Sequence, residues 1–181
     1  FMELQDFVLR EDITLEQLSQ IIDSGESSPG YFSKNAQNLQ IAHSISLYDI
    51  SAKLLSHNNT YKPKQPMDRI ASRSYTGIVI DARGMLPVHG EFITEGTEPC
   101  LFPRIWDETM DLLYEHNMVQ PEVIKTQGVV TYGYSSDITS YKNRVGKDPL
   151  VIKARKVFGT HRTDPVISRS DALRILSIPE N

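Results

Sequence analysis

The spacing of apolar residues predicts helices over the first third of the chain. Thr14 and Gln17 are placed as a capping box at the start of one helix. Ile13 and Leu18 flank this box at the positions of a hydrophobic staple. Gly25 is of the type that ends a helix. We therefore expect a short amphipathic helix before residue 25.

From Ser33 to His57, apolar residues recur every three or four positions. This pattern predicts a second amphipathic helix of about six turns. Pro63 and Pro66 follow, and proline breaks a helix because it lacks the amide hydrogen. We therefore place a boundary here, between an N-terminal helical segment (1–66) and a second domain (67–181).

The second domain has the pattern of strands. Residues 76–82 are β-branched and almost continuously apolar, which predicts a central strand buried on both faces. A long loop or irregular hairpin is expected at 84–99. The remaining strand expectations are a hairpin of 101–106 with 112–115 and strands at 129–134, 150–158 and 165–168. A helix is expected at 121–127, a polar helix or long turn at 137–145, and a last helix at 172–176, capped by Ser168 and Asp171. The predicted class is α+β: a mixed, mainly antiparallel sheet packed with helices, preceded by the N-terminal helical segment.

Composition adds exclusions. The 181 residues carry 19 Lys and Arg against 23 Asp and Glu, a net charge of −4, which argues against nucleic acid as a partner. Basic residues nevertheless gather in the last third, as a solvated face or a surface for an acidic partner. A single cysteine excludes an internal disulfide. No apolar run reaches about 18 residues and the start does not resemble a signal peptide, so membrane attachment would need an anchor outside this chain.

Candidate chemistry centres on Asp81 and Arg83, at the end of the first predicted strand. The segment 77–84 resembles part of a motif in tail-specific serine peptidases, although the Asn and paired glycines of that motif are absent. A hydrolase of this kind would need Asp81 beside a Ser–Lys or Ser–His pair. The favoured alternative is a structural polar cluster in which Asp81, Arg83, Arg104 and Asp107 neutralise one another.

Other candidates are less specific. Trp106, Tyr132 and Tyr134 form a candidate aromatic surface for an envelope glycan or lipid. The five histidines are scattered, and Cys100 stands at the start of an apolar stretch, where a buried small side chain is expected. We expect no metal, no cofactor and no enzymatic activity.

An ordered set of motifs resembles a bacterial family of periplasmic proteins and lipoproteins grouped around the flagellar accessory proteins FlgP and FlgT. The matching segments are 76–84, 103–108, 128–132, 144–154 and 159–172. The resemblance implies a periplasmic or outer-membrane-associated, non-enzymatic protein in a flagellar motor-associated assembly. It further implies protein partners of the cell envelope or flagellar basal body, and a homo-oligomer. The expected contact surfaces are the helix Ser33–His57 and a longer loop at Leu86–Glu98.

Overall fold

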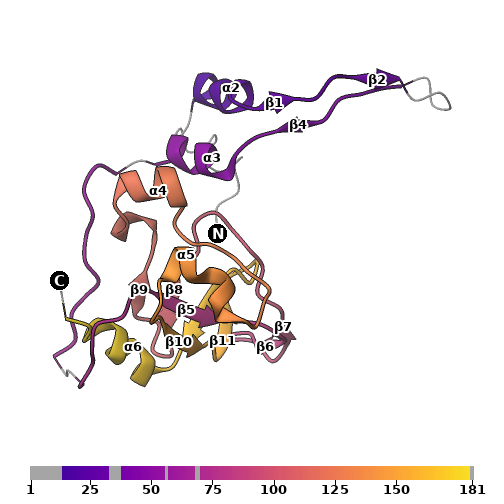
Figure 1. Cartoon of the computed structure of the whole chain (residues 1–181). Helices are drawn as coiled ribbons and strands as arrows, with labels where there is room; N and C mark the ends of the chain where they lie inside the picture. The colour runs from indigo at the N-terminus through magenta and orange to yellow at the C-terminus, as the bar shows by residue number, and fades with distance from the viewer. Residues whose placement is uncertain (1–13, 33–37, 56, 68–69, 180–181) are drawn as a thin grey trace. The chain divides into compact units, whose positions relative to one another are not determined.

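The computed structural model describes residues 14–32, 38–55, 57–67 and 70–179 (Figure 1). The chain forms two compact units. Unit 1 comprises residues 59–120 and 129–181, and unit 2 comprises residues 2–58 and 121–128. Helices occur in both units and most strand pairs are antiparallel, so the predicted α+β class is confirmed. Among the described residues, no helix has the length and apolarity required to cross a bilayer.

Unit 2 contains the predicted first helix, α2 (Leu15–Asp23). Its capping box is confirmed: the Thr14 amide donates to Gln17 Oε1 at 2.8 Å, and the Gln17 amide donates to Thr14 Oγ1 at 3.1 Å. The predicted staple involves Ile13, which lies outside the described residues. The described part of the unit also contains α3 (Leu47–Lys53) and α4 (Pro121–Gln127). The helix predicted at 121–127 is thereby confirmed.

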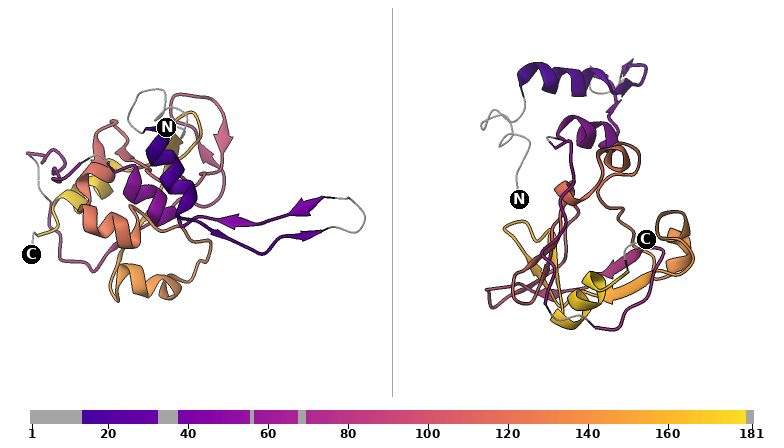
Figure 2. Two further views of the ribbon diagram at one scale, coloured as in Figure 1. Left: turned by 90° about the horizontal axis from the view of Figure 1, so that it is seen from above. Right: turned by 90° about the vertical axis from the view of Figure 1, so that its left-hand side faces the viewer.

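The long helix predicted from Ser33 to His57 is wrong. The described residues 25–32 and 38–45 form an antiparallel ribbon, which we call the arm (Figures 1 and 2). In it β1 (Glu26–Ser27) pairs with β4 (His43–Ser44), and β2 (Tyr31–Phe32) pairs with β3 (Leu39–Gln40). Among the described residues of the predicted range, only those of α3 are helical, and 33–37 and 56 lie outside the described residues. Leu39 and Ile41 are two residues apart and share one face of a strand. Because other apolar residues of the segment recur every three or four positions, the sequence pattern indicated a helix and not this two-residue period.

Unit 1 is built on a sheet in the order β11–β12–β8–β9. β12 runs parallel to β8, and the other two pairs are antiparallel. A separate parallel pair joins β5 to β10, and a short hairpin joins β6 to β7. The bounds are β5 Ile78–Asp81, β6 Leu86–Pro87, β7 Thr94–Glu95, β8 Ile105–Asp107, β9 Leu112–Tyr114, η1 His116–Met118, η2 Ile138–Tyr141, α5 Lys142–Val145, β10 Leu150–Lys153, β11 Lys156–Phe158, β12 Asp164–Ile167 and α6 Arg169–Leu176.

Several predicted elements of unit 1 are confirmed and three are corrected. The single strand predicted at 150–158 is two strands, β10 and β11, which belong to different sheets. The β8–β9 hairpin, the β6–β7 hairpin within 84–99 and the Ser168 cap of α6 agree with expectation. The strand at 76–82 exists as β5, but it is not central: it pairs with β10 alone and Ile78 is exposed. Residues 129–134 form no strand. Gly133 lies against the Tyr141 ring, so closely that an added Cβ would stand 2.2 Å from that ring. This segment therefore packs on the Tyr141 side chain and does not pair with a neighbouring strand.

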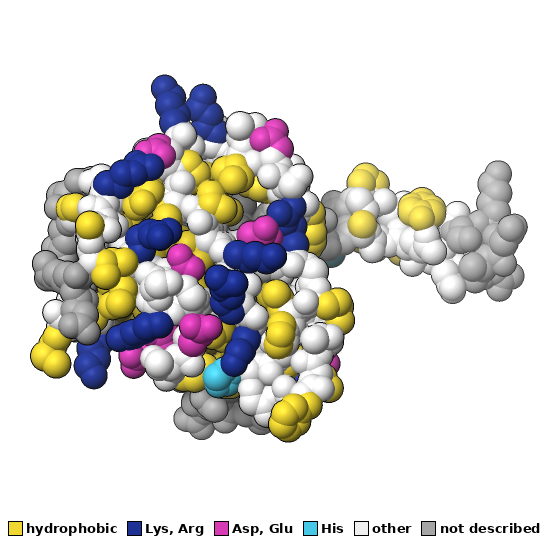
Figure 3. Space-filling model, turned by 90° about the horizontal axis from the view of Figure 1, so that it is seen from below, with side chains coloured by type: hydrophobic (Ala, Val, Ile, Leu, Met, Phe, Trp, Pro, Cys, Tyr) yellow, Lys and Arg dark blue, Asp and Glu magenta, His cyan; other side chains and the backbone are white. Residues whose placement is uncertain are grey.

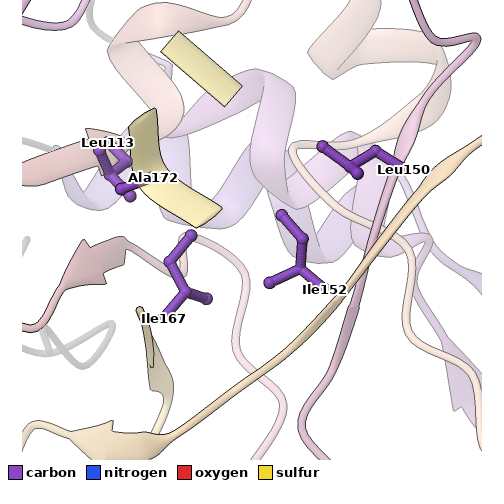
Figure 4. Packing of buried hydrophobic residues seen from close by; sticks show 5 residues of the cluster. All are labelled: Leu113, Leu150, Ile152, Ile167 and Ala172. Atoms are coloured by element: carbon purple, nitrogen blue, oxygen red, sulfur yellow. The ribbon is translucent and has the colours of Figure 1, made fainter. Parts of the chain in front are cut away.

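The main core of unit 1 lies between β9, β10, β12 and α6 (Figure 4). Alternate residues of β10 point inward, as the two-residue period of a strand requires. The members of this cluster are Leu113, Leu150, Ile152, Ile167 and Ala172. A second cluster, of Leu86, Val88, Ala154 and Val157, buries the β6 side of the unit. Both clusters fix the strand ends that carry the polar residues described next.

Candidate functional site

Asp81 and Arg83 lie where β5 ends, and they bind each other. Arg83 Nε donates to Asp81 Oδ1 and Arg83 Nη2 donates to Asp81 Oδ2, both at 2.8 Å. The Arg83 amide adds a bond to Oδ1 at 3.2 Å. These bonds from Arg83 lower the pKa of Asp81 to about 2. Both carboxylate oxygens are thus occupied by one local guanidinium, so Asp81 is held as a structural anion.

Asp107 is fully buried at the end of β8 and closes the turn to β9. Its Oδ1 accepts from the Thr109 amide at 2.9 Å, Thr109 Oγ1 at 2.7 Å and the Asp111 amide at 2.9 Å. Its Oδ2 accepts from Arg169 Nη1 at the start of α6. Burial opposes ionisation, but the bonds from Thr109 and Arg169 outweigh it and lower the pKa of Asp107. We call this group the Asp107 clasp.

Arg104 has partners outside the predicted cluster. Its Nε lies 3.4 Å from Oε2 of Glu115, a buried carboxylate that also accepts from the hydroxyl of Tyr61. Burial and this bond raise the pKa of Tyr61 to about 12. The Arg104 amide donates to Asp164 Oδ1 at 3.1 Å. The four predicted polar residues therefore belong to three separate groups, organised around Asp81, Asp107 and Glu115.

The three candidate aromatic residues also separate. Trp106 Nε1 donates to Asp164 Oδ2 at 3.3 Å, and its ring packs edge-on against Phe158. Tyr132 binds the backbone of Cys100, whose amide donates to the Tyr132 hydroxyl at 3.1 Å. Burial raises the pKa of the Cys100 thiol and of the Tyr132 hydroxyl. Tyr134 is 85% exposed. Trp106 is thus packed inside unit 1, whereas Tyr132 is 42% exposed and is held through its hydroxyl.

A serine and a histidine do meet, but in the arm. Ser27 Oγ lies 2.8 Å from His43 Nδ1, and His43 Nε2 lies 2.8 Å from the carbonyl oxygen of Ile22. A carbonyl can only accept, so His43 Nε2 carries a proton and donates to Ile22. An added Cβ on Gly25 would stand 2.4 Å from His43 Nε2. The ring therefore packs on Gly25 and fastens the arm to the end of α2.

Two open hollows, of about 420 and 360 Å³, flank Arg162. Arg162 has a left-handed backbone (φ 56°), and its guanidinium bridges Glu91 at 3.0 Å and Glu95 at 2.7 Å. It thereby ties the β11–β12 turn to the β6–β7 hairpin. Neither hollow is lined by Trp106, Tyr132 or Tyr134. In the described part of the chain, His, Cys, Asp and Glu form no group of three that could hold a metal ion.

Charge on unit 1 is mixed. Figure 3 shows Lys and Arg side chains interleaved with Asp and Glu on the face in view. Arg162, Arg169 and Arg174 of the basic last third all have acidic partners. Some of the basic residues of the last third thus form ion pairs within the chain and are not all available to an acidic partner.

Unit 2 differs because it exposes much of its apolar side-chain surface. In its described part the buried hydrophobic residues are Ile21, Leu54 and Ile124. Large apolar side chains are exposed on α2, α3 and the arm: Leu15, Ile22, Tyr31, Phe32, Leu39, Ile41, Leu47 and Tyr48. Figure 3 shows such side chains along the arm. Exposed apolar groups gathered in this way mark contact surfaces.

Comparison with known proteins gives two matches to family models. Residues 77–181 match the second domain of Treponema pallidum Tp0624, and residues 2–53 match its N-terminal domain. The chain belongs to the Tp0624 family. This is a bacterial family, and nothing in the comparison extends to FlgP or FlgT. No curated protein matches the chain. The two Tp0624 matches leave 54–76 between them, the stretch that contains the sequence-based boundary at 66 and the break between the compact units after Asn58.

Sequence reasoning missed the Arg169, Glu115 and Asp164 partners of this Tp0624-family chain. Asp107 and Arg169 are 62 residues apart, and Arg104 and Asp164 are 60 apart. Only the parallel pairing of β8 with β12 brings them together. Asp164 and Arg169 both lie in 159–172, the last segment of the sequence resemblance. The strand predicted at 165–168 places them at its two ends. That placement is the signal that could have identified them.

Proposed function

We propose that this Tp0624-family protein is a non-enzymatic component of the bacterial cell envelope that acts through protein–protein contacts, in a flagellar motor-associated assembly. The envelope location and the flagellar setting rest on the sequence resemblance described above. The contact role rests on the surface of unit 2.

The exposed apolar surface of unit 2 is the observation that supports this proposal most. Each square ångström of apolar area left in water forgoes about 25 cal/mol of burial free energy. In unit 2, exposed large apolar side chains outnumber the buried ones among the described residues, and they gather on α2, α3 and the arm. Unit 1 buries two apolar clusters. A partner that covers unit 2 would recover the burial that this unit forgoes.

The polar groups favour a structural role over catalysis. A hydrolase would require Asp81 to orient a nucleophile–base pair, but both Asp81 oxygens bind Arg83. The Ser27–His43 pair is oriented by a backbone carbonyl and fastens the arm. A glycan- or lipid-binding module would need the candidate aromatic rings around one cavity, and Trp106 and Tyr132 instead have separate partners, Asp164 and the Cys100 backbone.

Photo-crosslinking in the bacterium that encodes the protein tests this function. A photoreactive amino acid replaces Phe32, Leu15 or Leu47 on unit 2, with exposed Val151 of β10 in unit 1 as the control outside the expected contact surfaces. We expect protein adducts of defined mass from unit 2 positions and none from Val151. Absence of adducts at all three unit 2 positions would refute the contact role.

Cell fractionation and motility test the other two parts. We expect the protein in the periplasmic or outer-membrane fraction, and we expect loss of motility on deletion. A protein confined to the cytoplasm would refute the envelope location, and normal motility in the deletion strain would refute the flagellar setting.

A further inference from the structure

The arm has one apolar face. Its pairing places Phe32 opposite Leu39, and Ile41 lies two residues from Leu39 on the same side. An added Cβ on Gly30 would lie 2.9 Å from Leu39 Cδ1 and 3.2 Å from Ile41 Cγ1, so both side chains lie over Gly30. Tyr31 and Gln40 are paired on the opposite face, where the tyrosine hydroxyl donates to the amide oxygen. The arm is therefore an amphipathic ribbon.

The two strand pairs of the arm differ in register by one residue. Ser27 is paired with His43, and Tyr31 is paired with Gln40, so three residues on the first strand face two on the second. This is a bulge, and it contains Pro29 and Gly30. The Ser28 amide still donates to the Ala42 carbonyl at 2.8 Å. The arm is a built ribbon with its own pairing and a fixed root at His43.

The apolar face of the arm is uncovered in one chain. Phe32 is 73% exposed, Leu39 53% and Ile41 55%. The ribbon leads away from α2 and α3, so these helices of the same unit do not cover it (Figures 1 and 2). Residues 25–45 contain one acidic residue, Glu26, and one basic residue, Lys34. With one residue of each sign, the arm has no net charge from Asp, Glu, Lys and Arg. It therefore does not repel a second copy of itself, and it offers no excess charge that would attract a partner of opposite charge.

Unit 2 also carries a second uncovered apolar surface. Leu15 and Ile22 of α2 are seven residues apart and therefore share one side of the helix. They are 72% and 50% exposed. With an area on the order of 200 Å² for a large apolar side chain, the arm face offers about 360 Å² and the α2 stripe about 240 Å².

We infer that the partner of the arm is a second copy of this chain, whose α2 stripe of Leu15 and Ile22 receives the arm face of Phe32, Leu39 and Ile41. Because each copy carries both surfaces, a two-fold dimer makes the contact twice and closes. The two contacts together bury about 1,200 Å² of apolar side-chain area, the lower end of the range for specific, stable interfaces. This inference rests on the proposed contact function and names its partner.

Light scattering during size-exclusion chromatography measures the association. We expect a dimer at micromolar concentration. The double variant F32S/L39S should raise the dimer dissociation constant at least tenfold, because it removes most of the apolar face. The control Y31S alters the opposite face and should leave the constant within about twofold. A monomer at 100 μM for the unaltered chain, which is on the order of the concentration that detects a weak dimer, would overturn the inference.

Disulfide trapping tests the geometry. In a C100S background, a chain carrying F32C is mixed with a chain carrying I22C, and Q20C on the other side of α2 serves as the matched control. We expect a mixed F32C–I22C dimer and little F32C–Q20C product. Exclusive F32C–F32C product would overturn the arm-to-α2 contact.

The two proposals fail separately. Photo-crosslinks from Phe32 to a different protein in cells would refute the second copy as partner and leave the contact function in place. Absence of crosslinks at every unit 2 position would refute the contact function itself.

Discussion

Replacement of Asp107 by Ala should destabilise unit 1 far more than the same change at Asp81. Asp107 is fully buried and accepts from two amides, a hydroxyl and Arg169. Asp81 is 29% exposed and is bound by Arg83, which is 49% exposed. D107A and D81A each remove a carboxylate that is paired with an arginine. Their comparison therefore shows how much more a buried pair stabilises than an exposed one.

The magnitude follows from the groups left behind. D107A removes the acceptor of the Thr109 and Asp111 amides in a part-buried turn, and a hydrogen bond to a charged group contributes about 1.5–3 kcal/mol. Arg169 keeps Asp111 at 3.1 Å and is 41% exposed, so its charge stays solvated and adds little. We therefore expect a loss of about 3 kcal/mol for D107A, at the lower end of the range for a broken buried pair. For D81A we expect less than about 1 kcal/mol, as for exposed pairs.

Urea unfolding followed by tryptophan fluorescence measures this difference. The chain has one tryptophan, Trp106, and it lies in unit 1. With an m value of about 2 kcal/mol/M, the midpoint should fall by about 1.5 M for D107A and by less than about 0.5 M for D81A. Far-ultraviolet circular dichroism should give the same midpoints. Equal midpoints for the two variants would refute the clasp as a stabilising group.

The clasp also predicts an acid dependence. The pKa of Asp107 is lowered in the folded state, below the value of about 3.9 for an unperturbed Asp. Its contribution is therefore complete above about pH 4 to 5 and is lost as the pH falls through the lowered folded value. The midpoint difference between the unaltered chain and D107A should shrink as the pH is reduced below about 4. A difference that stays constant down to about pH 2 would contradict this assignment.

Three further predictions concern packing and reactivity. G77A should lower the free energy of unfolding in urea by about 1–3 kcal/mol, because a Cβ there would stand 2.7 Å from the Val145 Cα. The control G96A has open space around it and should change this free energy by under about 0.5 kcal/mol, so equal effects would contradict the packing at Gly77. Cys100 should react with a thiol reagent at pH 8 at least tenfold more slowly in the folded than in the urea-unfolded chain, because burial raises its pKa, and equal rates would contradict its burial. A fluorophosphonate probe should leave Ser27 unlabelled by mass spectrometry, because its partner His43 is part of the arm root, and stoichiometric labelling would revive the hydrolase alternative.

Local signals in the sequence predicted the capped elements well. The Thr14 box of α2, Pro121 at the start of α4 and the Ser168 cap of α6 each depend on residues within four positions of one another. The polar groups could not be predicted in the same way. Asp107 finds Arg169 only through the parallel pairing of β8 with β12, and that pairing depends on the whole sheet. The predicted cluster joined Asp81 and Arg83 to Arg104 and Asp107, and of these pairings the structure contains only that of Asp81 with Arg83.

The failure of the helix prediction at 33–57 bears on the contact function. Periodicity assigns a helix because it assumes that an apolar stripe will be buried inside its own fold. In this segment the apolar residues lie on both an exposed ribbon and a short helix, so the assumption fails where burial within the chain fails. Leu39 and Ile41 would be explained as core residues if the segment were helical. As ribbon residues over Gly30 they have no cover in one chain, and a docking surface gives their apolar character a physical reason.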